Sequence, residues 1–326
     1  MKIHVVVNPA GASGRTGKKF KKLLPILDGC GHEVQIHYST REHGIGAICS
    51  EITAAPPGEE LYIILVGGDG TLNEAINGME HIERIHLGYI PAGSGNDLAE
   101  SLGLSGKDLD VQLRRILELT DRRSMDIGEI RYGALSDVLC SQKDIGYVGD
   151  DSFYRRRFHD STGLGFDAAI CQAADASKYK TVLNKLHLGK LIYIVNAIHL
   201  IFSLKPAHIR VEVDGSVTDY ERTMLFVCMN NNYEGGGFKF CPDAKNDDGL
   251  LDICTATPAK NMDFFKIFPT AYDGRHVKFD TIHMDRGKEI HVTSESFEWV
   301  HTDGEVKCKS NELTVRLLPE QIKLLM

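Results

Sequence analysis

Segments with the character of strands alternate with amphipathic stretches along residues 1–125. Four segments have the length and residue types of strands, and they lie at residues 3–7, 33–38, 61–66 and 85–90. Three stretches have the spacing of helices, at residues 18–27, 43–54 and 70–78. The repeated strand–helix order predicts an α/β domain, with a mostly parallel sheet and helices on both faces.

The pattern changes in residues 126–318, which we expect to form a second domain. Short segments of β-branched and aromatic residues, separated by turn residues, predict an antiparallel β-sandwich there. The expected strands are 209–213, 223–229, 250–255, 277–283, 289–293, 298–301 and 313–318. One helix is expected at residues 185–204, and the polar residues 136–157 are expected to form an insertion or a mobile loop.

The charge balance and the cysteines narrow the classes of function. The chain of 326 residues carries 37 Lys and Arg against 45 Asp and Glu, a net charge of −8. This acidic balance disfavours a nucleic-acid-binding protein. None of the eight cysteines forms a CxxC pair, so we expect no zinc site, and reduced thiols of this kind suit a cytoplasmic protein.

No segment has the apolar length that a transmembrane helix needs. The longest apolar stretch, residues 188–204, is interrupted by Lys190, Asn196 and His199. It is shorter than the ~20 apolar residues that span a bilayer. The N-terminal apolar run ends at residue 8 and is too short for a signal peptide. We therefore expect any lipid ligand to be met at the membrane surface, with the protein cytoplasmic and peripheral to the membrane.

The strongest candidate for chemistry is the sequence VGGDGTLNE at residues 66–74. A strand runs into two glycines, then Asp69, then a helix, and such a turn lets a backbone approach a phosphate closely. A carboxylate beside phosphates is repulsive unless it holds a magnesium ion or takes a proton, which predicts one of these roles for Asp69. The alternative is a plain strand–turn–helix in which Asp69 caps the helix.

Two further glycine-rich turns follow the first and fourth expected strands. Residues 8–18, NPAGASGRTGK, are similar to a P-loop, but Gly11 and Gly17 are one residue too far apart and Lys19 replaces the expected Ser or Thr. Arg15 or Lys18 of this turn is expected near phosphates. Residues 90–99, IPAGSGNDLA, form the third turn. Each turn alone fits a flexible loop or a helix cap, but three at one sheet edge predict a nucleotide site.

The second half contributes acidic turns. In the sequence HTDGE at residues 301–305, Asp303 or Glu305 is placed to help a hydroxyl attack a γ-phosphoryl group, although a solvated hairpin turn is the alternative. The loop at residues 230–252 is rich in glycine and aspartate, and its carboxylates and carbonyls suit magnesium. From spacing alone, a plain Asp-Gly turn before a strand is the favoured interpretation of this loop.

Six segments in this order resemble the diacylglycerol kinase catalytic family, which includes bacterial diacylglycerol and lipid kinases, sphingosine kinases and ceramide kinases. They are NPAGASGRTGK, GGDGTLNEAINGM, IPAGSGNDLA, GLGFDA, GGGFKFCPDAKNDDGLLD and TDGEV. The resemblance spans nearly the whole chain. It implies an N-terminal α/β nucleotide-binding domain, joined by residues 319–326, and a C-terminal β-sandwich for the lipid substrate. It also implies an active site in the interdomain cleft.

The resemblance implies ATP and Mg²⁺ as cofactors and assigns residues to them. The residues expected at the nucleotide are Asn8, Pro9, Ala10, Gly11, Ala12, Thr40, Gly67, Gly68, Asp69, Gly70, Thr71, Leu72, Asn73, Ser94 and Asn96. A structural magnesium site would use the backbone carbonyls of Lys245 and Leu250 and the carboxylate of Asp248.

Among the catalytic residues that the resemblance implies, Glu305 ranks first as proton acceptor and Asp69 second, with Asp303 beside them. The sequence departs from the family at two places. Residues 137–157 are longer than in compact bacterial members and are expected to form a lid or a lipid-contacting loop. Ser94 stands where many relatives have threonine, and it keeps the hydroxyl.

The expected function is ATP-dependent transfer of the γ-phosphoryl group to a lipid hydroxyl. Diacylglycerol is favoured, while a sphingoid base, ceramide or phosphatidylglycerol stays open, as does a homodimer. One alternative is an NAD kinase-like enzyme, against which the turns at residues 8–18 and 91–99 argue. The other is a non-catalytic lipid-binding or regulatory protein, against which the retention of Asp69, Asp303 and Glu305 argues.

Overall fold

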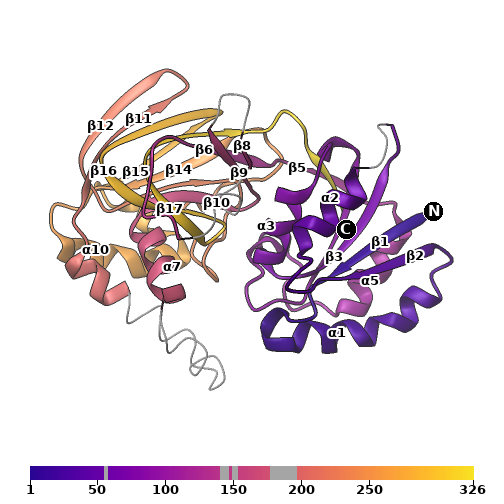
Figure 1. Ribbon diagram of the computed structural model, residues 1–326. Helices are drawn as coiled ribbons and strands as arrows, with labels where there is room; N and C mark the ends of the chain where they lie inside the picture. Colours follow the sequence, from indigo (N-terminus) through magenta and orange to yellow (C-terminus); the bar gives the residue numbers. More distant parts are fainter. Residues whose placement is uncertain (55–57, 140–146, 149–152, 177–196) are drawn as a thin grey trace. The chain divides into compact units, whose positions relative to one another are not determined.

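The computed structural model describes residues 1–54, 58–139, 147–148, 153–176 and 197–326 (Figure 1). These residues form two compact units. The first consists of Met1–Ile127, Asn246–Asp248 and Leu318–Met326, and the second of Gly128–Lys245 and Gly249–Leu317. The first unit therefore includes the end of the chain.

The first unit is built on a six-stranded sheet of order β2-β1-β3-β4-β18-β5. Its strands are β1 (Lys2–Val7), β2 (Glu33–Tyr38), β3 (Leu61–Gly67), β4 (Ile85–Pro91), β5 (Arg122–Met125) and β18 (Ile322–Leu325). Its helices are α1 (Gly11–Asp28), α2 (Ile45–Thr53), α3 (Asp69–Gly78), η1 (Ile82–Arg84), α4 (Asp97–Ser101) and α5 (Leu109–Glu118). All neighbouring strands are parallel except β18 and β5, which are antiparallel.

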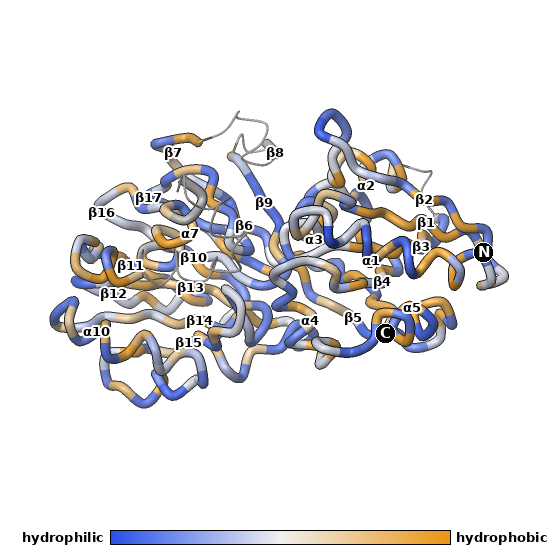
Figure 2. Tube along the Cα trace, turned by 90° about the horizontal axis from the view of Figure 1, so that it is seen from below, coloured by the Kyte–Doolittle hydropathy of each residue, from blue (hydrophilic) through white to orange (hydrophobic). Residues whose placement is uncertain are grey.

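Both faces of this sheet are covered, and its inner strands β3 and β4 are accordingly buried along nearly their whole length. Alternate residues of β1 point to opposite faces: Val6 packs with α2 and α3, whereas Val5 and Val7 pack with α1 and α5. Figure 1 shows these two pairs of helices on opposite sides of the sheet, and Figure 2 shows the hydrophobic residues along β1 and β3. The turns that follow the strands therefore stand at one rigid edge.

The second unit is dominated by antiparallel strands. They are β6 (Gly128–Tyr132), β7 (Leu135–Ser136), β8 (Tyr147–Val148), β9 (Tyr154–Phe158), β10 (Ser161–Gly165), β11 (Ala207–Val213), β12 (Ser216–Thr223), β13 (Leu225–Met229), β14 (Leu251–Ala256), β15 (Ile282–Gly287), β16 (Glu289–Thr302) and β17 (Glu305–Leu317). The helical elements are α7 (Phe166–Ala176), α10 (Asn261–Ile267), η2 (Phe268–Asp273) and η3 (Arg275–Lys278). The main path of the sheet is β15-β14-β13-β10-β16-β17-β6-β9-β8.

The predicted fold class, a mostly parallel α/β unit followed by an antiparallel β unit, is confirmed. Details of the second unit differ from the prediction. The strand expected at residues 277–283 is wrong in its first half, because hydrogen bonds from Gly274 N to Ala271 O and from Phe279 N to His276 O hold 3₁₀ turns there. The strands expected at 289–293 and 298–301 are one strand, β16, with a register irregularity between them.

The loop expected at residues 136–157 contains strand structure. Arg156 and Arg157 lie in β9, which pairs with β6, and the neighbouring acidic residues explain how a strand accommodates three consecutive arginines. Residues 140–146 and 149–152 of the expected lid lie outside the described residues. Of the helix expected at 185–204, residues 197–203 are helical, and residues 185–196 lie outside the described part. Within the described ranges, no helix combines the length and apolarity needed to cross a bilayer.

Candidate active site

The three glycine-rich turns meet at the carboxyl ends of β1, β3 and β4. The first two are joined through Asn8, whose Nδ2 donates to Thr71 Oγ1 at 3.2 Å and whose Oδ1 accepts the Gly11 amide at 3.1 Å. The helix that follows the first turn begins earlier than the expected residue 18. Its first turn contains left-handed residues, with φ of 49° at Ala12 and 59° at Ser13. Such backbone strain is held only where surrounding contacts demand it.

The second and third turns are in direct backbone contact. A Cβ added to Gly93 would lie 2.3 Å from Gly68 Cα, and one added to Gly68 would lie 2.7 Å from Gly95 O. Asp69 crosses the same contact, because its Oδ2 accepts the Asp97 amide at 3.0 Å. The glycines are thus required so that the two turns can pack together, and Asp69 holds them at a fixed separation.

The first and third turns are joined by Thr16, whose hydroxyl donates to Ala92 O at 2.9 Å and is buried. Sequence reasoning did not single out Thr16. All three turns are therefore tied to one another, and we call this assembly the turn cradle. A cradle of glycine turns beside the N-termini of α1, α3 and α4 is suited to an anion such as a phosphate.

The structure separates the predicted nucleotide residues by exposure. Leu72 and Asn73 are fully buried in α3, so their side chains belong to the core of the helix packing. Ser94 is exposed in the third turn, while Thr40 is exposed after β2, where its hydroxyl accepts the His43 amide at 3.1 Å. The remaining predicted residues lie in the turns, at the end of β3 or in the first turns of α1 and α3: Asn8, Pro9, Ala10, Gly11, Ala12, Gly67, Gly68, Asp69, Gly70, Thr71 and Asn96.

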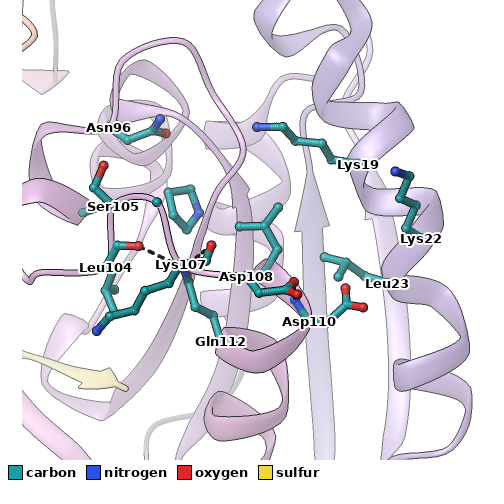
Figure 3. Close-up of a pocket in the computed structure, with 14 residues that line it drawn as sticks. Lys19, Lys22, Leu23, Asn96, Leu104, Ser105, Lys107, Asp108, Asp110 and Gln112 are labelled. Atoms are coloured by element: carbon teal, nitrogen blue, oxygen red, sulfur yellow. Dashed lines mark hydrogen bonds between the residues drawn. The ribbon is translucent and has the colours of Figure 1, made fainter.

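A pocket of about 390 Å³ adjoins the third turn (Figure 3). Asn96 is the predicted site residue that lines it, and its other lining residues come from α1, the end of β4, α4, the segment before α5 and the start of α5. Lys19, Lys22 and Lys107 bring positive charge to the pocket, partly balanced by two aspartates. Figure 3 shows Lys19 extending from α1 toward the side where Asn96 lies. These lysines favour anionic ligands near the turn cradle.

In the second unit, Asp303 and Gly304 form the two-residue turn between β16 and β17. Their φ values of 50° and 76° are those of a type I′ hairpin turn, for which Asp-Gly is a preferred sequence. The Asp303 carboxylate is fully buried and accepts the backbone amides of His159, Asp160 and Ser161 at 2.9–3.1 Å. This geometry suits a residue that positions the segment before β10, because its oxygens already serve three amide donors.

Glu305, which follows the turn, is accessible. Its side chain is 28% exposed, and its Oε2 lies 2.8 Å from Arg156 Nη2 and 3.1 Å from Lys307 Nζ. Arg156 is nearly buried, so this ion pair fixes the direction of the carboxylate. Of the two predicted acids in the turn, Glu305 is therefore the one that can meet a substrate.

Sequence reasoning missed a buried polar group beside Asp303. Asp160 is buried, and burial raises its pKa although the neighbouring His159 opposes this. Asn231 Nδ2 donates to Asp160 Oδ1 at 2.7 Å, and the Nδ2 groups of Asn230 and Asn231 both donate to His159 O, at 2.9 and 2.7 Å. The sequence does contain a hint of this buried group. Two pairs of consecutive polar residues, His159 with Asp160 and Asn230 with Asn231, each lie next to the residues of an apolar strand.

A second buried group lies beneath the Asp303–Gly304 turn. His301 Nε2 is 2.7 Å from Asp167 Oδ2 and 3.4 Å from Glu234 Oε1, and all three side chains are buried. Burial alone would lower the pKa of His301, but Asp167 and Glu234 raise it to about 9. The Gly304 amide lies 3.3 Å from His301 Nδ1 and points its hydrogen at that nitrogen. This contact favours a neutral ring, in which Nδ1 carries no hydrogen and can accept. The two carboxylates outweigh this long contact, because charge-assisted hydrogen bonds are about twice as strong as neutral ones.

We expect the stability that His301 contributes to depend on pH. Its pKa is raised on folding from 6.5 to about 9. The contribution is therefore fully present below pH 6.5 and lost as pH rises through 9, by roughly 3 kcal/mol. Urea unfolding of the wild type and of His301→Gln at pH 6 and pH 9 measures this, and the difference in unfolding free energy between the two proteins should shrink at pH 9.

The matched control is His276→Gln, which removes another buried histidine. Burial lowers the pKa of His276, and its Nε2 contacts Phe240 O at 2.9 Å. The difference between wild type and this variant should not shrink between pH 6 and pH 9. A pH-independent difference for His301→Gln would show that the ring is neutral.

The residues of the predicted structural magnesium site, Lys245, Asp248 and Leu250, lie together in the short loop before β14. Residues 246–248 of this loop belong to the first unit, in which Asp126 N donates to Asn246 O at 2.7 Å. Asp126 in turn accepts Gln321 Nε2, so the loop, β5 and β18 are connected. The cation site itself stays a prediction.

The five fully described buried cysteines give no sign of reactivity. Burial raises the pKa of Cys49 and of Cys254 to about 12, which disfavours the nucleophilic thiolate. Burial therefore makes these two thiols poor nucleophiles.

Comparison with known proteins matches two family models to the chain. Residues 2–130 match the diacylglycerol kinase catalytic domain, and residues 161–326 match the YegS C-terminal NAD kinase beta sandwich-like domain. The second match covers half of the chain.

Curated relatives agree with these matches. A diacylglycerol kinase of Staphylococcus saprophyticus is 30% identical over 92% of this chain and 88% of its own. A diacylglycerol kinase of Bacillus subtilis is 27% identical over the same shares. A crystal structure of a diacylglycerol kinase from Bacillus anthracis superposes with a TM-score of 0.67 at 20% identity, covering 99% of this chain and 96% of that one, and so supports the fold.

The predicted resemblance is thus confirmed, and the predicted enzyme class, a phosphotransferase acting on an alcohol, is confirmed at the level of the family. The turn cradle, the Asp303–Gly304 turn and the matches over both units agree: the chain belongs to the diacylglycerol kinase family.

Proposed function

We propose that the protein transfers the γ-phosphoryl group of ATP to the free hydroxyl of diacylglycerol. The observation that carries this proposal is the turn cradle, in which three glycine turns and Asp69 are tied together at one sheet edge. The names of the relatives at 27% and 30% identity favour diacylglycerol over other lipids.

In this proposal the cradle binds the triphosphate. The Gly68 and Gly93 backbones are in contact where any Cβ would clash, so the second and third turns stay packed together around the proposed phosphate site. The N-terminus of α3 adds a favourable dipole for the phosphate charge. Ser94 is exposed in the third turn, and the lysines beside Asn96 add positive potential.

Asp69 is the residue that would hold a magnesium ion. Carboxylate oxygens are the ligands that magnesium prefers, and the bond from the Asp97 amide to Oδ2 fixes the orientation of this carboxylate. The donor set of the cradle thus fits the ion. When bound, magnesium would neutralise charge on the phosphates.

Glu305 would accept the proton of the lipid hydroxyl. The hydroxyl oxygen forms a bond to the γ-phosphorus, the bond from that phosphorus to ADP breaks, and the proton passes to the Glu305 carboxylate. Arg156 and Lys307 hold that carboxylate in place. Asp303, fully buried and bonded to three backbone amides, acts as a positioning residue for the segment that begins at His159.

The proposal is tested by incubating the protein with labelled ATP and magnesium and with separate dispersions of diacylglycerol, sphingosine, ceramide and phosphatidylglycerol, and with NAD. We expect label in phosphatidic acid. Label in NADP would instead favour the NAD kinase-like alternative. Binding of lipid with no label in any product would favour the non-catalytic alternative.

Glu305→Gln is expected to lower kcat by about a hundredfold or more with little change in the KM for ATP, because general-base catalysis contributes factors of this size. Glu298→Gln is a matched control on β16 and should retain activity, since Glu298 is bonded to Ser296 away from the turn. A Glu305→Gln protein with wild-type kcat would remove Glu305 from the role of proton acceptor.

A further inference from the structure

Exposed apolar side chains gather on two short helices of the second unit, the helix of residues 197–203 and α10. Ile198 and Phe202 of the first helix are 43% and 56% exposed, and Met262 and Phe265 of α10 are 49% and 41% exposed. We call these four side chains the apolar patch. Figure 1 shows the two helices beside each other.

Contacts between the two helices make the patch continuous. The rings of Phe202 and Phe265 have centroids 6.4 Å apart, and Asn261 Nδ2 donates to Leu204 O at 3.1 Å. Arg222 bonds the Pro258 carbonyl at 2.9 Å and the Asn261 side chain, which fixes the start of α10. The positions of the two helices that carry the patch are therefore fixed by contacts within the second unit.

The inward faces of the same helices are already used for packing. Ala197, Ile201, Phe264 and Ile267 are buried in one core cluster of the second unit. A surface helix ordinarily places polar residues on its outward face. Because both helices are apolar outward as well as inward, the patch has the character of an interaction site.

Three lysines surround the patch. Lys205 follows the first helix, Lys260 precedes α10 and Lys266 lies in its last turn, and all three are exposed. In a chain of net charge −8, this is a local excess of positive charge. The acidic residue of α10 is Asp263, which is half-buried and accepts the Lys260 amide at 3.1 Å.

We propose that the apolar patch and these three lysines dock on the surface of an anionic phospholipid bilayer. Apolar side chains on a short helix enter the boundary between headgroups and acyl chains, while lysines meet anionic headgroups. A second copy of the chain fits less well, because a two-fold contact would place one lysine-bearing patch against another and bring like charges together. The inference rests on the proposed lipid kinase function, whose acceptor stays in a bilayer.

Sedimentation with vesicles tests the docking surface directly. The probes are vesicles of phosphatidylcholine alone and of phosphatidylcholine with phosphatidylglycerol. The wild type should bind the anionic vesicles and release them at high salt. The double variant Phe202→Asp/Phe265→Asp should bind about tenfold more weakly or worse. The control Phe297→Asp, at a residue 40% exposed on β16, should bind as the wild type does.

The triple variant Lys205→Gln/Lys260→Gln/Lys266→Gln leaves the apolar packing untouched and so keeps the test independent of folding. Each lysine near an anionic surface strengthens binding about fivefold, so the triple variant should bind anionic vesicles about a hundredfold more weakly than the wild type. Wild-type binding by this variant or by a folded Phe202→Asp/Phe265→Asp protein would overturn the proposal. So would a concentration-dependent dimer of the wild type that the phenylalanine variant dissociates.

Kinase assays separate this inference from the proposed function. On short-chain diacylglycerol dispersed in water, the patch variants should keep the wild-type kcat, whereas on long-chain diacylglycerol in anionic vesicles they should lose activity in step with binding. If the wild type phosphorylates neither substrate yet binds vesicles through the patch, the proposed function fails and the docking surface stands. Equal activity of wild type and patch variants on vesicles would overturn the docking surface alone.

Discussion

Replacing Asp69 with alanine or asparagine is expected to abolish phosphoryl transfer, lowering kcat by about a thousandfold or more. In the proposed function, Asp69 is the carboxylate of the turn cradle that would hold a metal ion to offset the phosphate charge. Asparagine is the sharper variant, because its side-chain oxygen can still accept the Asp97 amide that Oδ2 accepts now. Turnover of labelled ATP on diacylglycerol measures the effect.

The control for Asp69→Asn is Asp28→Asn, at an exposed aspartate of the same unit that ends α1 and does not line the pocket beside Asn96. That variant should keep wild-type kcat and stability. Thermal unfolding should show Asp69→Asn folded, so that lost activity reports chemistry. A folded Asp69→Asn enzyme with nearly wild-type kcat would contradict both the role of Asp69 and the proposed site.

Combining Asp69→Asn with Glu305→Gln asks whether the two carboxylates serve one reaction. Residues that act in the same step have strongly non-additive effects, so the double variant should be little worse than the more damaged single variant. If the decrease in kcat of the double variant instead equalled the product of the two single decreases, the two residues would act independently.

Replacing Gly93 with alanine should unfold the first unit or destabilise it by about 3 kcal/mol or more, since overpacking between groups that cannot move is costly. The added Cβ would lie 2.3 Å from Gly68 Cα and 2.8 Å from Gly68 N, and both are backbone atoms. The second and third turns would be forced apart, and the bond from the Asp97 amide to Asp69 would be lost. Urea unfolding and ATP binding both report the change.

Gly29→Ala is the matched control for this substitution. Gly29 ends α1 with a φ of −97°, and its added Cβ would meet Pro25 O at 3.5 Å, an ordinary contact. We expect that variant to be as stable as the wild type or slightly more so, because alanine reduces the freedom of the unfolded chain. A Gly93→Ala protein as stable as Gly29→Ala would mean that the two turns are not packed as described.

Local features of the first unit followed directly from the order of residues. The strand–helix alternation and the three glycine turns were predictable because each depends on short-range patterns of apolar residues and glycine. Parallel strands then bring successive turns to one edge, so the neighbourhood of Asn8, Asp69 and Asn96 could also be anticipated. The Asp303–Gly304 turn was equally local, since Asp-Gly between two strand patterns favours a tight hairpin.

The partners of these residues were not predictable, because they come from distant parts of the chain. Arg156 pairs with Glu305 across 149 residues, and His301 bonds Asp167 across 134. Such pairs depend on strand register, and a shift of one residue turns every side chain to the other face. The resemblance implied that residues 319–326 join the first domain, but the place of β18 between β4 and β5 depends in the same way on distant partners.

The division of roles between Asp303 and Glu305 shows the difference most clearly. Both were predicted as acids of one turn. The resemblance ranked Glu305 first, but it carried no information on the surroundings of either residue. Packing buries Asp303 against three backbone amides and leaves Glu305 28% exposed between Arg156 and Lys307. Which side chains a turn carries is written in the residue order, but which of them faces solvent is set by the strands on either side, because burial is a property of the whole sheet.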